Sequence, residues 1–355
     1  MYRIDGGQYS GSGTIVRDAI ALAAITGQAV RIYNIRARRK PPGLRAQHVT
    51  VVRAIAALCS GQLRGDTVGS STLEFIPGST IAGGNYRFDI GTAGSTTMLA
   101  SALLPVLLFA RKPSRVVLLG GVFQDFAPSA FHFQQVLLPM LRQMGVPATL
   151  TIERPGYVPT GGGCIHLQVT PPEGPLVPVQ QVDQGNILQV EGIALASHLK
   201  QRHVVHRMAQ SCERRLQAHG FYPSIRRLED EAEHPAFHRV APQPGAALAI
   251  WAHTSTGAIL GADMAGKPGR SSEFIGERVA QQFLEDVASG ATVDRHLADQ
   301  WIPFAALAAG KSRVRLPAIT DHVTTRLWVV ELLLQVATRQ EGNLLTIEGK
   351  GLSPA

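Results

Sequence analysis

The segment Asp89-Ile90-Gly91-Thr92-Ala93-Gly94-Ser95 decides the fold, because the unit that it opens occurs more than once in the chain. After this glycine-rich turn the pattern predicts an apolar helix over 98–108 and a strand over 115–119. An earlier copy begins at the turn 5–13, continues through a helix and ends in a strand over 29–33. In both copies a glycine-rich turn opens a helix that leads to a strand.

A third unit is predicted near the C-terminus. Residues 321–325 open a helix that carries Leu327, Val330 and Leu334, and a strand follows over 344–347. Repeated units of this kind usually stack around a shared core. We therefore expect one large domain built from three such units.

The region from about 183 to 267 differs from these units. It contains predicted strands over 185–190 and 246–251 and, after it, a helix over 273–287. Its own helix is rich in basic residues, namely Lys200, Arg202, His203, His206, Arg207, Arg214 and Arg215. We interpret this region as a small inserted domain, whose basic helix is either a solvated face or a face that contacts RNA.

A basic loop follows the first predicted strand. The stretch from Ile35 to His48 places five cationic side chains around a Pro-Pro-Gly turn. Guanidinium groups match phosphate oxygens with rigid forks of donors, and the prolines restrict the backbone that presents them. The loop is therefore either an ordinary solvated basic loop or a phosphate-binding loop.

Composition limits the class of protein. The chain has 355 residues, 45% of them hydrophobic, a formal charge of +8 and a pI near 9.7, which favours a polyanionic partner such as nucleic acid. The three cysteines, Cys59, Cys164 and Cys212, are widely spaced and suggest neither a disulfide framework nor a zinc site. We find no signal peptide or bilayer-spanning run, and we expect a cytoplasmic protein with no membrane partner.

Common nucleotide and hydrolase motifs are absent from the sequence. None of the glycine-rich turns, including 161–163, has the spacing of a P-loop or a dinucleotide-binding fingerprint, and 7–11 is not a nucleophile elbow. Glycines and helix N-termini can still expose backbone amides to an anion. Any chemistry of the chain therefore uses a less common arrangement.

Several spaced motifs together resemble the RNA 3′-terminal phosphate cyclases. The resemblance runs nearly end to end and rests on these segments: Asp5-Gly6-Gly7-Gln8 with Arg17, the loop 35–48, Gly91–Ser95, Gly120-Gly121 with Ala127-Pro128-Ser129, Arg154–Pro159 with Gly161–Gly163, Leu297–Gln300, and Asp321-His322 ahead of Trp328–Glu331. Their order along the chain makes the set far more specific than any one motif.

The resemblance implies an α+β fold shared with enolpyruvyl transferases. A large catalytic domain of three repeated units, each a mixed four-stranded sheet backed by two helices, would cover 1–182 and 272–355, with a small α/β domain inserted over 183–271. The implied reaction is the ATP-dependent conversion of an RNA 3′-phosphate into a 2′,3′-cyclic phosphate. It proceeds through a covalent histidine-AMP intermediate and an RNA-adenylate, from which the 2′-hydroxyl expels AMP.

The resemblance also implies roles for particular residues. His322 matches the nucleophile, and a histidine at a helix start tends to stay uncharged because the helix dipole disfavours the imidazolium. Residues that match binders of ATP and its phosphates are Arg17, Arg36, Arg39 and Gln47, with Asp299 near the adenosine. His296, expected in the same helix as Asp299, would stack on adenine, and Pro128 is a weaker candidate for the other face of the base.

Three positions depart from the family pattern. Ser10 stands where a glutamate usually helps to hold the divalent metal, Ser101 stands near an expected glutamine, and Arg326 replaces an asparagine. A hydroxyl is a poorer ligand than a carboxylate for Mg²⁺ or Mn²⁺, so the binding mode of the metal is open. We therefore expect adenylylation that is slower than in the family or that depends differently on the metal. Equal ATP consumption by the Ser10→Glu variant and the wild type would contradict this expectation.

Other functions stay open from the sequence. The chain is either a cyclase acting on RNA with a 3′-phosphate end, a non-catalytic RNA-binding relative, or a nucleotidyl transferase acting on other phosphate ends. His322 argues against the second possibility, whereas Ser10 and Arg326 argue for it. An enolpyruvyl transferase is disfavoured because it would leave the basic surplus and the His322 segment without a role.

Overall fold

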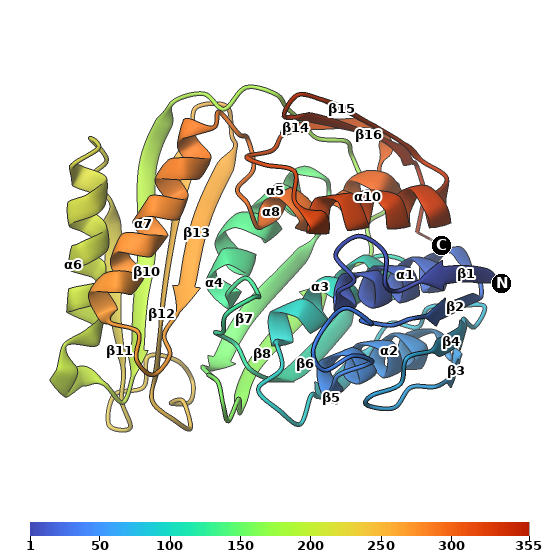
Figure 1. Cartoon of the computed structure of the whole chain (residues 1–355), viewed down its shortest axis with the longest axis horizontal. Coiled ribbons are helices and arrows are strands. Elements are labelled where there is room, and N and C mark those ends of the chain that lie inside the picture. Colours follow the sequence, from blue (N-terminus) through green and yellow to red (C-terminus); the bar gives the residue numbers. More distant parts are fainter. Residues whose placement is uncertain (355) are drawn as a thin grey trace.

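The computed structural model describes residues 1–354, which form four four-stranded sheets with helices packed on them (Figure 1). The first unit comprises β1 (Tyr2–Asp5), α1 (Gly13–Thr26), β2 (Val30–Tyr33), α2 (Ala46–Cys59), β3 (Gln62–Arg64) and β4 (Leu73–Ile76). The second comprises β5 (Asn85–Asp89), α3 (Thr96–Leu107), β6 (Ser114–Gly120), α4 (Ala130–His132), the π-helix Phe133–Leu137, α5 (Leu138–Gln143), β7 (Ala148–Arg154) and β8 (Gly163–Val169).

The third unit and the insertion complete the chain. The third unit comprises β9 (Gln180–Gln181), α8 (Leu297–Gln300), α9 (Ile302–Leu307), β14 (Ala309–Arg315), α10 (Asp321–Leu334), β15 (Ala337–Glu341) and β16 (Leu344–Lys350). The insertion comprises β10 (Ile187–Ser197), the 3-10 helix Lys200–Arg202, α6 (Val204–Gln217), β11 (Ser224–Asp230), β12 (Gly245–Thr254), β13 (Ile259–Ala265) and α7 (Ser272–Ala288).

Three sheets share one topology. Their strand orders are β1-β2-β4-β3, β5-β6-β8-β7 and β9-β14-β16-β15. In each, the first two strands are parallel and the remaining pairs are antiparallel. This repetition confirms the predicted α+β fold with three repeated mixed sheets.

The equivalence of the helices differs from the prediction in the third unit. The sequence pattern matched α10 to α1 and α3, which lie between the two parallel strands of their sheets. The structure places α10 after the second of these strands, as α2 is placed in the first unit. Both helix positions are preceded by polar turns, so local pattern did not distinguish them.

The inserted unit leaves the large domain after β9 and occupies one end of the molecule (Figure 1). Its strand order, β11-β10-β12-β13, differs from that of the repeats. Val279 and Phe283 of α7 are fully buried in the same apolar cluster as Leu248 and Leu260 of its sheet. The sequence predicted an inserted unit over 183–271; since α7 completes this core, we propose that the unit covers 183–288.

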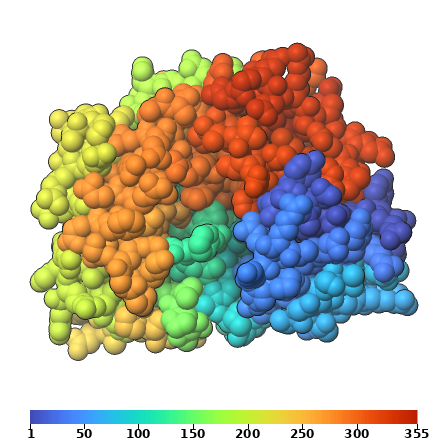
Figure 2. Space-filling view, in the orientation of Figure 1, coloured from blue at the N-terminus to red at the C-terminus, as the bar shows by residue number. Residues whose placement is uncertain are grey.

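Helix α1 lies at the centre of the large domain. Every residue of 13–24 is buried, because α2, α3 and α10 all pack against this helix. The apolar side chains Ile15, Val16, Ile20 and Leu22 account for that burial. Packing of α1 on α10 brings the two ends of the chain together, and Figure 2 shows the N-terminal residues lying against the C-terminal ones. In the described part of the chain, no helix is both long and apolar enough to cross a membrane.

Candidate active site

His322 lies in the first turn of α10. The hydroxyl of Thr320 caps this helix by accepting a hydrogen bond from the backbone amide of Val323 at 3.2 Å. The histidine retains exposed surface, although protein atoms enclose part of its ring. A helix N-terminus presents unpaired amides and a partial positive charge, both of which favour an anion.

Helix α1 supplies the groups nearest to the ring. The Nδ1 atom of His322 lies 3.2 Å from the Oγ1 atom of Thr14, in the first turn of α1. The same hydroxyl oxygen accepts a hydrogen bond from the Nη2 atom of Arg17 at 3.1 Å. Arg17 is buried one turn further along the helix. Two helix N-termini, a histidine and a buried guanidinium thus meet at one place.

The surroundings of His322 keep its imidazole neutral. Enclosure of the ring lowers its pKa from the ordinary value of 6.5, and Arg17, Arg326 and Arg39 lower it further. Asp299 acts in the opposite direction without reversing the shift. From the sequence, only the helix dipole was expected to keep the His322 ring neutral. The structure adds two further causes, the enclosure of the ring and the three nearby guanidinium groups. A neutral ring has a lone pair available for nucleophilic attack.

A buried ion cluster lies behind the histidine. The Nε atom of Arg326 lies 3.3 Å from the Oδ2 atom of Asp18 and 3.3 Å from the Oδ2 atom of Asp299. Arg326 also donates a hydrogen bond to the backbone carbonyl of Asp299 at 2.9 Å. Arg326 and Asp18 are buried. Burial lowers the pKa of Arg17 to about 10 and raises the pKa of Asp18, although Arg326 and Arg17 partly oppose the latter shift. The cluster joins α1, α8 and α10 behind the reactive ring.

Ser10 lies at the same junction. Its Oγ atom accepts a hydrogen bond from Thr325 at 2.9 Å and lies 3.0 Å from the hydroxyl of Ser12, and Arg39 donates to its carbonyl at 3.0 Å. These contacts place Arg39 of the basic loop beside the histidine. They offer hydroxyl oxygens at the position where the resemblance implies a glutamate carboxylate. The residues around Ser10 therefore do not fit a ligand set for Mg²⁺ or Mn²⁺.

Arg36 and Gln47 make other contacts. The Nη1 atom of Arg36 donates to the carbonyls of Pro41 and Gly43 at 2.8 and 2.9 Å, so this side chain closes its own loop. Gln47 accepts a hydrogen bond from the amide of Ser95 at 3.2 Å. The structure thus joins the basic loop to the glycine-rich turn of the second unit, but in this geometry neither side chain contacts His322.

His296 and Pro128 lie at or beside a cavity whose lining does not include His322. A cavity of about 350 Å³ is lined by residues that include Asp125, Asp263, Arg270 and His296. The Nε2 atom of His296 is 3.5 Å from an Oδ1 atom of Asp263. Pro128 lies in the chain between two residues of the cavity wall, and its carbonyl accepts from Thr97. The sequence predicted His296 and Asp299 in the same helix. His296 instead precedes that helix, because α8 begins one residue later.

Thr14, Asp18 and His48 are site residues that sequence reasoning missed. Thr14, Arg17 and Asp18 have the spacing i, i+3, i+4, which places them on one face of an otherwise apolar helix. That polar face is the signal that could have identified them. His48 is buried beneath the start of α1, and burial together with Arg17, Arg36 and Arg45 lowers its pKa to about 3.

Known proteins match this chain over nearly its whole length. A sequence model of the family described as "RNA 3′-terminal phosphate cyclase" matches residues 8–339. A protein of that name from Hyperthermus butylicus is 39% identical over 94% of this chain and 92% of its own length. The proteins of that name from Methanothermobacter thermautotrophicus and Staphylothermus marinus are 38% and 35% identical, over 96% and 100% of this chain and 97% and 99% of their own lengths.

One solved structure is only distantly similar to this chain. The enolpyruvyl transferase NikO from Streptomyces tendae is 12% identical, with a TM-score of 0.41, over 100% of this chain and 49% of its own. The fold assignment rests instead on the repeated strand order. With the family match over 8–339 and relatives 35–39% identical along almost their full lengths, this chain belongs to the enzyme family of RNA 3′-terminal phosphate cyclases.

Proposed function

We propose that this protein converts an RNA 3′-phosphate into a 2′,3′-cyclic phosphate at the expense of ATP, with His322 as the nucleophile. The single observation that carries the proposal is the contact between His322 and the pair Thr14 and Arg17 at the meeting point of two helix N-termini. This arrangement provides an exposed neutral imidazole within reach of positive charge, which is what attack on a nucleotide phosphate requires.

We assign the tautomer of the ring in which Nδ1 carries the proton. The hydroxyl oxygen of Thr14 has two lone pairs, so it can accept from this Nδ1–H group as well as from Arg17. The Nε2 atom then holds the lone pair. Nε2 attacks the α-phosphorus of ATP, the new N–P bond forms, and the bond to pyrophosphate breaks with pyrophosphate carrying away the electron pair.

The next two steps regenerate the histidine. An oxygen of the RNA 3′-phosphate attacks the same phosphorus, so the N–P bond breaks and its electron pair returns to Nε2. The 2′-hydroxyl then attacks the 3′-phosphorus and releases its proton to water, which closes the cyclic phosphate and expels AMP with the electron pair of the broken P–O bond. Arg17 and Arg39, which already flank the ring, supply the positive charge that such phosphoryl transfers need.

The remaining residues that the sequence singled out have supporting roles in this proposal. Asp299 orients Arg326 behind the ring, and His296 contributes to a cavity of suitable size for a base, with Pro128 beside it. Arg36 and Gln47 hold the basic loop and the glycine-rich turn in position for the phosphates. We assign no protein ligand for a divalent metal at Ser10, and no step above depends on one.

Labelled ATP tests the proposal directly. The protein is incubated with ATP labelled at the α-phosphate, and we expect an acid-labile protein adduct in wild type that His322→Ala abolishes. His253→Ala, which changes an accessible histidine of the inserted unit, is the matched control. Failure of the wild type to become labelled, or persistence of the label in His322→Ala, would refute the proposed mechanism.

A competition experiment defines the substrate. Oligonucleotides with a 3′-phosphate are expected to discharge the adduct, and identical ones with a 5′-phosphate are expected to leave it intact. Faster discharge by the 5′-phosphate oligonucleotide would instead assign the chain to nucleotidyl transfer at other ends.

A further inference from the structure

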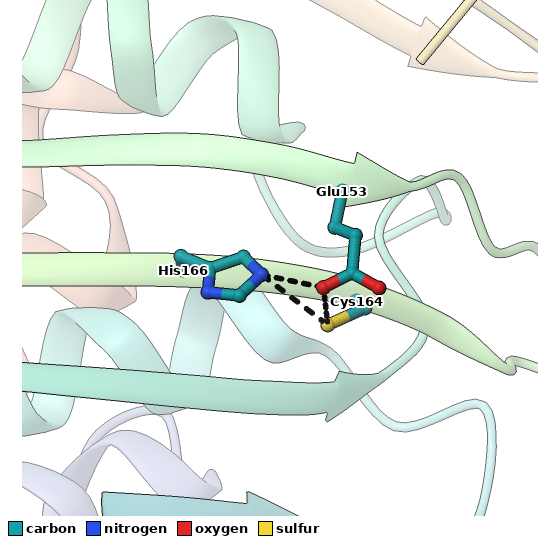
Figure 3. Close-up of side chains that lie close together, drawn as sticks. All are labelled: Glu153, Cys164 and His166. Atoms are coloured by element: carbon teal, nitrogen blue, oxygen red, sulfur yellow. Dashed lines mark hydrogen bonds and ion pairs between the residues drawn. The ribbon is translucent and has the colours of Figure 1, made fainter. Parts of the chain in front are cut away.

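A cysteine, a histidine and a carboxylate meet on the second sheet, away from the contacts of His322. Glu153 of β7 and Cys164 and His166 of β8 point toward one another (Figure 3). The Sγ atom of Cys164 is 3.5 Å from the Oε2 atom of Glu153 and 3.9 Å from the Nε2 atom of His166. The Oε2 atom of Glu153 and the Nε2 atom of His166 are 2.6 Å apart. Glu153 and Cys164 border the segments Arg154–Pro159 and Gly161–Gly163, but the three residues share no metal-binding spacing in the sequence, which therefore did not predict this cluster.

Strand geometry brings these three side chains together. Cys164 and His166 are two residues apart on β8, so they share one face of the sheet, while Ile165 and Leu167 point into the core. The register of β7 with β8 shifts between Ile152 and Arg154, which makes Glu153 the extra residue of a β-bulge. Bulges re-aim a side chain relative to the regular alternation. Glu153 thereby reaches the two residues on the neighbouring strand.

The inserted unit orients the carboxylate. The backbone amide of Arg239 donates to the carbonyl of Glu153 at 3.0 Å, and its Nε atom lies 3.3 Å from the Oε1 atom of the same residue. This contact leaves the Oε2 atom directed at Cys164 and His166. Partners that hold one oxygen of a carboxylate and direct the other are typical of metal ligands.

We propose that Glu153, Cys164 and His166 form a zinc site with one open position for water. Thiolate, imidazole and carboxylate are the three ligand types of zinc, and tetrahedral bonds of about 2.0–2.3 Å place ligand atoms about 3.3–3.7 Å apart. Two of the three separations lie close to that range. The distance between Nε2 of His166 and Oε2 of Glu153 needs to lengthen by about 0.7 Å, which rotation of the partly exposed imidazole and carboxylate allows.

Charge balance is compatible with zinc at this place. A thiolate and a carboxylate together neutralise Zn²⁺, so the bound site carries no net charge beside Arg239, and the proton that the Cys164 thiol donates to Glu153 is released to solvent when the metal binds. Hard cations such as Mg²⁺ prefer oxygen ligands and are disfavoured by a sulfur and a nitrogen. The site is therefore selective for a softer ion than the one associated with nucleotide phosphates.

Cobalt titration of the full chain, without ATP or RNA, tests the proposal independently of the enzymatic reaction. Protein stripped with a chelator, and free of any affinity tag, is titrated with Co²⁺. We expect one equivalent to bind, with the near-ultraviolet charge-transfer absorption of a cobalt thiolate, and to be displaced by Zn²⁺. Absence of binding, or bound cobalt without that absorption, would overturn the proposal.

Matched variants locate the site. Cys164→Ala and His166→Asn are expected to weaken binding by at least about 10–100-fold, whereas Cys212→Ala, another buried cysteine, and His253→Asn, which pairs with Glu191 at 3.6 Å, are expected to bind as wild type. Glu153→Gln keeps the shape of a partly exposed side chain and therefore tests the site even if a strand variant fails to fold. Unchanged affinity in Glu153→Gln and in the folded strand variants would refute the assignment.

Discussion

Replacing Arg326 with methionine removes the cation that forms ion pairs with both Asp18 and Asp299 in the buried cluster. The side chain of Arg326 is 5% exposed and that of Asp18 is 8% exposed, so water does not replace the lost partner. The variant Arg326→Met keeps most of the side-chain volume. It therefore isolates the charge from the packing.

The expected loss follows from the geometry. At 3.3 Å each ion pair is worth about 5 kcal/mol of attraction at an effective dielectric constant of about 20. Much of this attraction is offset by desolvation, and removal of one partner of a buried pair typically costs about 3–5 kcal/mol. An unfolding entropy of about 2.1 cal/mol/K per residue converts this cost into a fall of about 4–7 °C in the melting temperature of 355 residues.

The loss should depend on pH and on Asp18. Burial already raises the pKa of Asp18, and loss of Arg326 removes an effect that lowers it. A carboxyl whose pKa is higher in the folded state stabilises that state as pH falls. The deficit of Arg326→Met should therefore be largest near pH 8 and shrink toward pH 5. Adding Asp18→Asn should recover about half of it, because one of the two buried carboxylates that lost their ion pair with Arg326 is neutralised.

Thermal unfolding followed by circular dichroism measures these effects. Arg31→Met is the matched control, because Arg31 forms a surface pair with Glu74 at 3.4 Å and its loss should shift the melting temperature by about 1 °C or less. A deficit in Arg326→Met that equals the control, or that grows as pH falls, would refute the reasoning about the buried cluster.

Three further predictions concern the residues around the reactive histidine. Because the pKa of His322 is lowered, its neutral form persists below the ordinary pKa of about 6.5, and adenylylation is lost only as pH falls through the lowered value. Arg39→Gln removes one cause of that lowering, so the acid limb of the pH-rate profile should move to higher pH, and an unmoved limb would contradict the assignment. Thr14→Val removes the hydrogen-bond partner of Nδ1 and should slow single-turnover adenylylation by about tenfold, equivalent to about 1.4 kcal/mol; an undiminished rate would show that the tautomer is held in another way. Gly13→Ala places a Cβ atom 1.9 Å from Nε2 of His48, so it should destabilise the fold by about 1–3 kcal/mol, which an unchanged melting temperature would disprove.

Local pattern predicted much of the fold. The strands and helices of the first two units follow from apolar periodicity between glycine-rich turns, and their actual bounds differ by a few residues. Repetition of the pattern predicted stacked units, which the three equal strand orders confirm. The predicted equivalence of α10 with α1 and α3 was wrong, and for the end of the inserted unit we propose 288 in place of the predicted 271. Both features depend on which sheet a helix packs against and not on the helix's own sequence.

The candidate site could be predicted only in part. The resemblance singled out His322, Arg17, Arg39 and Asp299, which the structure brings close together, and their roles stay predictions until labelling tests them. Arg36, Gln47, His296 and Pro128 also remain candidates, although their contacts lie in the basic loop and around the cavity and not at the ring of His322.

By itself the sequence determined the family, the basic character and the repeated secondary structure, because each is written in residue type and spacing along the chain. Only the tertiary structure decided that Thr14 meets His322, 308 positions away, and that a one-residue bulge turns Glu153 toward Cys164 and His166. Such contacts depend on how helices pack and how strands register. Packing and register are set by the whole core rather than by neighbouring residues.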